Sequence, residues 1–301
     1  MNPQRLIVPL VLMASACLLA FPFPSSANNA QANKMVVLHV RVTDPLGRAV
    51  RDVQQAAFQV TEDGAPQKIE LFVKEDLPLI YGLMIDASGS LRSQFSGIVR
   101  AGRNIINSNY DSDQAFLVRF ISSNKIENVQ ECTTDKKQLL DGLDSLYIEG
   151  GQTAILDAVY LSADYLSKQK TAGQARHKVL ILVSDGEDRV SYYDKETLFA
   201  FLAANDTQIF TIGFTNDVKP EKRQQAISLL TQMAFETGGQ TFFPRNDAEL
   251  DRISREIIDN IRTQYVIGYT PTGDSKEVHK VAVSLTPDED KRVVITRIGY
   301  Q

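Results

Sequence analysis

The central part of the chain, from about residue 78 to 263, alternates short apolar runs with longer amphipathic segments. The run KVLILVSD at 178–185 is apolar without a period of two, which is typical of a central parallel strand. Because parallel neighbours need a crossover connection, this alternation predicts an α/β fold with a doubly wound, mostly parallel sheet covered by helices on both faces. No other feature restricts the possible folds as strongly.

The expected elements of this region follow one another regularly. Strands are predicted at 80–85, 115–122, 179–184, 209–214 and 240–243, with an additional edge strand at 125–132. Helices are predicted at 92–107, 136–146, 154–168, 195–204, 220–237 and 247–263. In the third of these helices, Ile155, Val159 and Leu166 contribute to an apolar face at helical spacing.

Both flanks of the central region alternate with period two, which indicates β-strands. Within 35–73, the dipeptide Asp63-Gly64 separates two alternating runs and predicts a hairpin. The C-terminal segment, 264–301, alternates in the same way in VHKVAVSL. Since either flank alone would make a poor sheet, we predict that 264–301 pairs with 35–73 in one small β domain. The α/β domain would be inserted into that β domain, and two unlinked β flaps are the alternative.

Residues 1–27 have the pattern of an export signal. Arg5 precedes an apolar run at 6–21, which is short of the roughly 20 residues that a membrane-spanning helix needs. Ser25 and Ala27 fit the small-residue pattern of a cleavage site. We therefore predict a secreted or periplasmic protein without an integral membrane span after cleavage; a retained anchor is the alternative. The remaining N-terminal part, 28–77, would then be the first β segment.

Composition argues against several classes of function. The net charge is −5, lysines and arginines are scattered, and there is no Trp, so nucleic acid is not an expected partner. Cys17 and Cys132 are the only cysteines, and cleavage of the signal would leave Cys132 without an internal partner. Lipidation of Cys17 is the alternative if the signal is processed there. The three histidines lie far apart in the sequence, which disfavours a Cys/His zinc site.

Three loops rich in oxygen ligands follow or precede elements of the predicted sheet, at 86–90, 150–154 and 184–188. Ligands of open parallel sheets bind beyond the carboxyl ends of the strands, so we expect these loops to converge there. Together they offer carboxylates and hydroxyls, which suit a hard divalent cation. The candidate ligands of Mg²⁺, or alternatively Mn²⁺ or Ca²⁺, are Asp86, Ser88, Ser90, Thr153 and Asp185.

Simpler roles compete with metal binding at several of these positions. Asp86 and Thr153 belong to residue types that are favoured as helix N-caps. Glu187 and Asp188 are expected to form a solvated turn rather than to bind the ion. Gly89 is expected to permit a close backbone turn between the two serines.

Enzymatic signatures are absent from the sequence. An aspartyl-phosphate type of phosphatase needs a second Asp where Ser88 stands, and neither a phosphate-binding Gly-rich loop nor a nucleophile elbow occurs. His177 precedes a predicted strand, so it should lie at the opposite end of the sheet from Asp86. We therefore expect a binding protein and not an enzyme.

The three loops together resemble the metal-ion-dependent adhesion site (MIDAS) of von Willebrand factor type A (VWA) domains. The matching patterns are DxSxS at 86–90, GxT at 151–153 and SDG at 184–186. The resemblance covers about 78–263 and implies a VWA domain with a Rossmann-like fold. The flanking motifs are similar to those of an exported bacterial subgroup of VWA-related proteins, best known from Acidobacteria.

The resemblance assigns a role to each candidate ligand. Ser88 and Ser90 would bind the ion directly, and Thr153 would bind it directly or through water. Asp86 and Asp185 would hold the ion or its waters from behind the directly bound hydroxyls.

The resemblance also implies a function. The sixth coordination position would be open to an Asp or Glu carboxylate of a partner protein, as in an exported adhesion or protein-interaction module. The alternatives are a scaffold subunit of an envelope complex with a closed metal site and, less favoured, a metal-assisted hydrolase. In adhesive members of the family the last helix shifts when ligand binds, which would concern 247–263 here.

Overall fold

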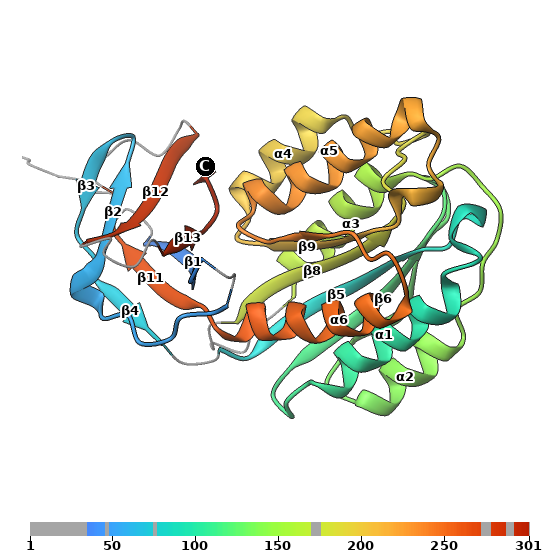
Figure 1. Cartoon of the computed structure of the whole chain (residues 1–301), viewed down its shortest axis with the longest axis horizontal. Coiled ribbons are helices and arrows are strands. Elements are labelled where there is room, and N and C mark those ends of the chain that lie inside the picture. Colours follow the sequence, from blue (N-terminus) through green and yellow to red (C-terminus); the bar gives the residue numbers. More distant parts are fainter. Residues whose placement is uncertain are drawn as a thin grey trace, which may run out of the picture. The chain divides into compact units, whose positions relative to one another are not determined.

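The structure is a computed structural model that describes residues 35–45, 48–74, 77–169, 176–271, 278–286 and 292–300. The predicted export signal and Cys17 lie outside these residues. All described residues belong to one compact unit, in which a six-stranded sheet with helices and a smaller β part can be distinguished (Figure 1). Within the described ranges, no helix is both long and apolar enough to cross a membrane.

The larger sheet has the strand order β10-β9-β8-β5-β6-β7. Its strands are β5 (Leu79–Asp86), β6 (Gln114–Phe120), β7 (Ile126–Thr133), β8 (His177–Ser184), β9 (Gln208–Gly213) and β10 (Thr241–Phe242). All neighbours pair in parallel except β6 and β7. The predicted parallel sheet and its additional edge strand are therefore confirmed. Strand order reverses at β5, so the topological switch point lies at its carboxyl end.

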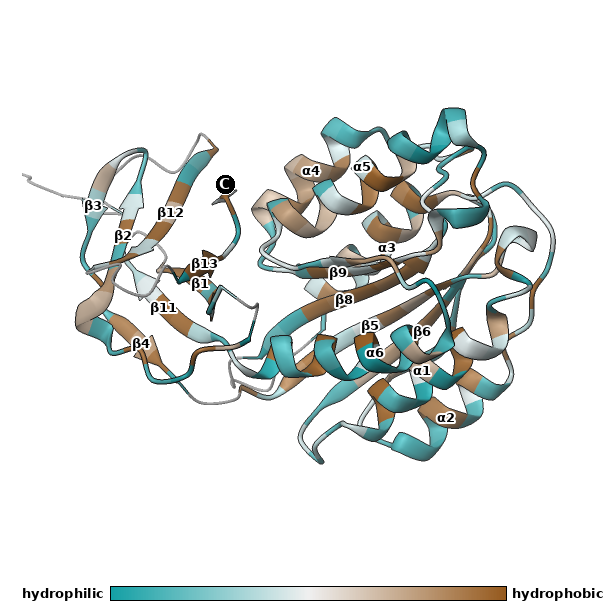
Figure 2. Ribbon diagram, viewed as in Figure 1, coloured by the Kyte–Doolittle hydropathy of each residue, from teal (hydrophilic) through white to brown (hydrophobic). Residues whose placement is uncertain are grey.

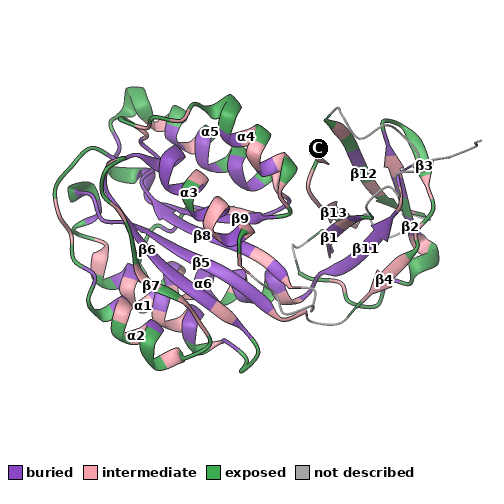
Figure 3. Cartoon of the chain, turned by 180° about the vertical axis from the view of Figure 1, so that it is seen from behind, coloured by how far each residue is buried: buried purple, intermediate pink, exposed green. Residues whose placement is uncertain are grey.

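Helices cover both faces of this sheet (Figure 1). They are α1 (Phe95–Asn107), α2 (Lys136–Asp144), α3 (Ile155–Ser167), α4 (Lys195–Ala204), α5 (Pro220–Glu236) and α6 (Asp247–Arg262). Leu83 of β5 packs in the apolar cluster with α1, α2 and α6, whereas Met84 packs with α3, α4 and α5. Figures 2 and 3 show the resulting apolar, buried strands between the helices.

Most predicted bounds lie within two residues of those observed, and two of the differences have a local cause. The helix expected from residue 92 begins at Phe95, because a 3-10 turn, η2 (Gly89–Leu91), first carries the chain away from β5. The strand expected at 240–243 is reduced to Thr241–Phe242, and Pro244, which has no backbone N–H to pair, follows shortly after. Two further 3-10 turns are η1 (Gln55–Ala57) and η3 (Thr215–Asp217).

The smaller β part consists of two four-stranded sheets, ordered β13-β1-β11-β4 and β14-β12-β2-β3. Its N-terminal strands are β1 (Val36–Thr43), β2 (Phe58–Glu62), β3 (Ala65–Gln67) and β4 (Leu71–Val73). Its C-terminal strands are β11 (Tyr265–Tyr269), β12 (His279–Leu285), β13 (Val293–Ile295) and β14 (Gly299–Tyr300). Because β1 pairs with β11 and β2 with β12, both antiparallel, both flanks supply strands to both sheets, as predicted.

The predicted hairpin is present between β2 and β3. Asp63 and Gly64 have φ values of 49° and 83°, which are the left-handed conformations that a two-residue type I′ turn requires. The dipeptide Asp-Gly therefore sets the register in which Glu62 faces Ala65.

Two histidines form a buried contact between β1 and the start of β8. The rings of His39 and His177 stack with centroids 3.8 Å apart and an interplanar angle of 10°. Burial, and then the charge of Arg297, lowers the pKa of His39 to about 3; burial, and then His39, holds the pKa of His177 well below its usual range. Asp206 lies 3.7 Å from His39 Nε2 but is partly exposed to solvent. Both rings are therefore neutral in the folded chain.

We expect this histidine pair to make the fold sensitive to acid. Between pH 6.5 and 3 the unfolded chain binds a proton that His39 excludes in the folded chain, so the contribution of this histidine to stability is complete above pH 6.5 and falls below it. The loss from His39 alone should be about 1.4 kcal/mol per pH unit, or about 2 kcal/mol at pH 5. Urea unfolding of the unaltered chain and of His39→Gln at pH 7 and pH 5 would measure this loss as the difference between their pH dependences, in which groups that titrate alike in both proteins cancel. An equally steep loss in His39→Gln would show that the pair is not its source.

Candidate metal centre

Asp86 is the last residue of β5 and lies at the topological switch point, between β8 and β6. Its side chain is fully buried. The Ser88 backbone N–H donates to Asp86 Oδ1 over 2.9 Å, and the Ser184 hydroxyl donates to Oδ2 over 2.7 Å. These two hydrogen bonds fix the carboxylate and turn the chain sharply after the strand.

The two serines of the first loop lie on the same side of this turn. Ser88 is buried, Ser90 is exposed, and their hydroxyl groups are hydrogen-bonded to each other with the oxygens 2.9 Å apart. Adjacent ligands of an octahedral Mg²⁺ ion with bonds of about 2.1 Å lie about 3 Å apart. The spacing of the two hydroxyls therefore fits one shared ion at the solvent-facing edge of the loop.

Backbone hydrogen bonds attach the second loop to the other two. The Glu149 N–H donates to the Ala87 carbonyl over 3.0 Å, and the Arg189 N–H donates to the Thr153 carbonyl over 2.8 Å. Thr153 is buried, and its hydroxyl makes no hydrogen bond to any residue that the structure describes. This hydroxyl is therefore available as a ligand close to the first and third loops.

Thr153 is not the cap of the third helix. The N-cap residue of α3 is Ala154, and the carboxylate of Asp188 accepts from Ile155 N over 2.7 Å and from Leu156 N over 3.2 Å. The N-cap alternative for Thr153 is therefore wrong, and so is the expectation that Asp188 belongs to a solvated turn. A residue about 33 positions away caps the helix instead.

The third loop follows β8. Asp185 is buried, and its Oδ1 accepts from the Glu187 N–H over 2.9 Å. Glu187 was expected in a solvated turn but is also buried, and it pairs with Arg189 and Lys222. Gly186 has φ +82°, and a Cβ there would lie 2.9 Å from the Ala226 carbonyl oxygen, so only glycine fits.

Gly89 does not have the role expected from the sequence. A Cβ added at this position would meet nothing within 4 Å, and its φ is not in the left-handed region. The turn between Ser88 and Ser90 is an ordinary 3-10 turn, which any residue can form. Glycine is required in the third loop of the site and not in the first.

The electrostatics of the site favour a cation. Burial, and then the negative charge of Asp185, raises the pKa of Asp86 to about 7, although hydrogen bonds from Ser184 and Ser88 oppose this shift. Among the described residues, no lysine or arginine forms an ion pair with either carboxylate. Two buried carboxylates without a counter-charge are costly. Together with the neighbouring hydroxyls, they form an oxygen ligand set that fits Mg²⁺.

Two sets of contacts that support the site were not predicted, those of Ser184, which belongs to the predicted third loop, and those of Arg119. Ser184 Oγ donates to Asp86 and accepts from the Gly186 N–H over 3.1 Å, so it joins the first and third loops. Arg119 of β6 is buried, pairs with Glu149 and stacks on the Tyr147 ring at 4.0 Å, which holds the chain leading into the second loop. The only sequence signal for the role of Arg119 was a charged residue within the apolar strand sequence FLVRF.

A second group of potential ligands lies in the β part. Glu62, Asp63 and His279 bring three ligand atoms within 4.8 Å of one another. However, Asp63 Oδ2 contacts His279 Nδ1 over 2.8 Å, and Asp63 Oδ1 accepts from Lys280 N over 2.9 Å. Glu62 accepts from the Tyr300 hydroxyl over 2.7 Å. Hydrogen bonds among these residues account for the arrangement.

Comparisons with known proteins agree with this architecture. The family model described as the von Willebrand factor type A domain matches residues 82–256. A von Willebrand factor type A structure from Catenulispora acidiphila is similar over 90% of this chain and 75% of that chain, with a TM-score of 0.51 and 13% identity. Proximal thread matrix protein 1 from the mussel byssus is similar over 62% of this chain and 48% of that chain, with a TM-score of 0.51 and 16% identity. No curated protein matches the chain significantly.

Proposed function

The chain belongs to the von Willebrand factor type A family, and from this premise we propose that it is an exported binding module. It would engage an acidic group of a partner protein through a divalent cation. VWA domains often depend on a metal ion and mediate protein interactions. Export, the periplasmic or cell-surface location and membership of the exported bacterial subgroup are parts of this proposal that rest on the N-terminal and flanking sequence motifs.

The observation that carries the proposal is the pair of hydroxyls at the edge of a buried acidic site. Ser88 and Ser90 have oxygens 2.9 Å apart, and Ser90 is exposed to solvent. An ion held by these hydroxyls would be accessible to a ligand from outside the protein. This exposure favours an adhesion site over the alternative of a closed, purely structural metal site.

The proposed ligand roles follow from position and charge. Ser88 and Ser90 would contact the ion, Thr153 would contact it directly or through water, and Asp86 and Asp185 would hold it or its waters. Direct hydroxyl ligation leaves much of the charge of the ion unneutralised, so the ion attracts a carboxylate from a partner. Mg²⁺, which prefers a near-octahedral shell of oxygen ligands, suits this set of hydroxyls and carboxylates, with Mn²⁺ and Ca²⁺ as alternatives.

A binding role is favoured over hydrolysis because none of the residues that the structure describes places a suitable general base at the site. His177 is the first residue of β8, whereas Ser184 at the other end of that strand contacts Asp86. His177 is moreover buried and stacked on His39. The carboxylates Asp86 and Asp185 would themselves be engaged with the ion.

We further propose 78–263 as the bounds of the VWA domain.

A capture experiment tests the proposal. Immobilised protein is incubated with an envelope extract of the source organism in Mg²⁺ or in EDTA, and the Asp86→Ala variant is used in parallel. We expect proteins to be retained by the unaltered chain in Mg²⁺ and lost in both other cases. Asp111→Asn is the matched control, because it removes an equal charge from an exposed position before β6, at the opposite edge of the sheet, and should retain the same proteins. Equal capture in Mg²⁺ and EDTA would contradict a metal-dependent role.

A further inference from the structure

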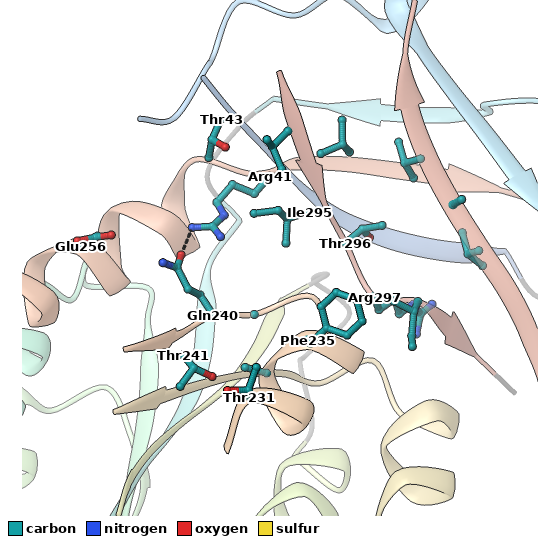
Figure 4. Close-up of a pocket in the computed structure, with 18 residues that line it drawn as sticks. Arg41, Thr43, Thr231, Phe235, Gln240, Thr241, Glu256, Ile295, Thr296 and Arg297 are labelled. Atoms are coloured by element: carbon teal, nitrogen blue, oxygen red, sulfur yellow. Dashed lines mark hydrogen bonds between the residues drawn. The ribbon is translucent and has the colours of Figure 1, made fainter. Parts of the chain in front are cut away.

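A cavity of about 660 Å³ lies away from the proposed metal centre and includes none of its residues. Its walls come from β1, β12 and β13 on one side and from α5, β10 and α6 on the other (Figure 4). This volume is within the range of about 300–1,000 Å³ that is usual for small-molecule sites. Much of the lining is apolar, and it includes Ala234, Phe235, Val281, Val283, Val294 and Ile295.

One buried cation reaches this cavity. Arg41 of β1 is 4% exposed, and its Nη1 donates to Gln240 Oε1 over 2.5 Å, as Figure 4 shows. This acceptor is a neutral amide that also accepts from Asn260 Nδ2 over 3.1 Å. Among the described residues, no carboxylate forms an ion pair with Arg41. A guanidinium has five N–H donors, and its burial is costly unless an anion compensates its charge.

The other charged groups of the lining are already engaged. Arg297 donates to the Val37 carbonyl over 2.9 Å and lies 3.6 Å from an oxygen of Asp206. Glu256 pairs with Arg252 one helical turn away on α6. The negative charge of Glu256 acts on Arg41 from a distance and partly opposes the lowering of its pKa by burial. Arg41 is therefore the position in the cavity where a bound anion would be most favourable.

We propose that this cavity binds an amphiphilic anion, with a carboxylate or phosphate head group on the Arg41 guanidinium and an acyl chain along Val283, Ile295 and Phe235. The apolar walls supply the hydrophobic contribution to binding, and the arginine fork supplies directional, charge-assisted hydrogen bonds. A free fatty acid and an anionic phospholipid share this chemistry. The site would be independent of the proposed metal centre.

Calorimetric titration of the purified chain with dodecanoate, below its micellar concentration, tests the proposal. Dodecylamine serves as the probe of opposite charge, and phosphatidylglycerol vesicles test the phospholipid source. We expect saturable binding of dodecanoate or retention on the vesicles, and no comparable binding of dodecylamine. Binding of neither anion, or equal binding of both dodecyl probes, would overturn the proposal.

Two variants separate the head group from the chain. Arg41→Met keeps the length of the side chain but removes its charge, and we expect it to weaken binding of the anion by about tenfold or more. Val283→Trp retains Arg41 but fills the cavity, and we expect it to prevent binding. A cooperative thermal unfolding transition establishes that each variant is folded. If Arg41→Met does not fold, the affinity of Val283→Trp for dodecanoate alone tests the proposal. Unchanged affinity in a folded variant would overturn the proposal.

Discussion

Replacing Asp86 by Asn is expected to abolish Mg²⁺ binding and, at the same time, to stabilise the metal-free chain above pH 7. Both effects have the same cause, because Asp86 is fully buried and faces the charge of Asp185. The asparagine side chain keeps an oxygen that can accept from Ser88 N or the Ser184 hydroxyl. It removes the negative charge that a cation requires and that the cation-free site tolerates poorly.

The sign of the pH effect follows from the pKa of about 7 that burial and Asp185 give to Asp86. Near pH 3.8 and below, the carboxyl group is protonated in both the folded and the unfolded chain. Between pH 3.8 and 7, the folded chain keeps a proton that the unfolded chain has lost, so stability falls as the pH rises. The loss should reach about 4 kcal/mol above pH 7 and should be absent from Asp86→Asn.

Urea unfolding of the unaltered chain and of Asp86→Asn in EDTA at pH 4 and pH 8 measures the loss as the difference between their two pH dependences, in which the opposite effect of His39 cancels. Calorimetry at pH 8 measures Mg²⁺ uptake. In the unaltered chain, Mg²⁺ should restore the stability lost at pH 8, because ligand that binds only the folded state stabilises it. Asp111→Asn is again the control and should change the free energy of unfolding by no more than about 0.5 kcal/mol. Normal Mg²⁺ uptake by Asp86→Asn would exclude this residue from the site.

The parts of the site that could be predicted are those encoded within a few neighbouring residues. Asp86 ends an apolar run, and the two serines follow at a spacing of two, so a single strand and turn position all three. Period-two and helical patterns predicted the strands and helices because they too are local, and they show which side chains of an element face the core. The pairing of the flanks was predictable because neither could form a stable sheet alone.

The remaining features depend on contacts between distant segments. Asp188 caps α3 because the third loop lies against the second, and no local pattern distinguishes such a cap from a solvated turn. Arg119 and Glu149 meet across 30 positions of the chain. Glycine is essential at position 186 because α5 passes close by, whereas Gly89 has open space beside it. Tertiary packing, which the sequence pattern does not specify, decides each of these cases.

A buried ion pair at the end of α6 likewise joins segments that are distant in the sequence. Asp113 is fully buried and pairs with Arg262, the last residue of α6, which also lies over the Tyr110 ring at 3.7 Å. The carboxylate further accepts from Leu79 N over 2.9 Å and from Tyr110 N over 2.7 Å. This cluster fixes the C-terminal end of α6 to the start of β5 and the turn before β6.

Asp113→Ala is therefore expected to lower the free energy of unfolding by about 3 to 5 kcal/mol. The variant leaves the buried Arg262 guanidinium without its carboxylate, and Nε and Nη1 of this arginine already lack a hydrogen-bond partner within the described part of the chain. Urea unfolding would measure the loss. Asp111→Ala, two positions away and exposed, is the matched control and should be nearly neutral. Adding Arg262→Met to Asp113→Ala should recover part of the stability, because it removes the unpaired charge.

The same variant tests whether the last helix can shift, as the resemblance to adhesive VWA domains implies. If α6 is displaced along its axis, either Asp113 must move with the helix or its ion pair with Arg262 must break. We expect Asp113→Ala to accelerate amide hydrogen exchange in residues 257–264, where the helix leads into β11, while Asp111→Ala does not. If Mg²⁺ and a bound partner accelerate exchange in the same residues of the unaltered chain, the metal centre is coupled to this helix end. Exchange that Asp113→Ala leaves unchanged would mean that the apolar packing of α6, and not the ion pair, holds the helix in place.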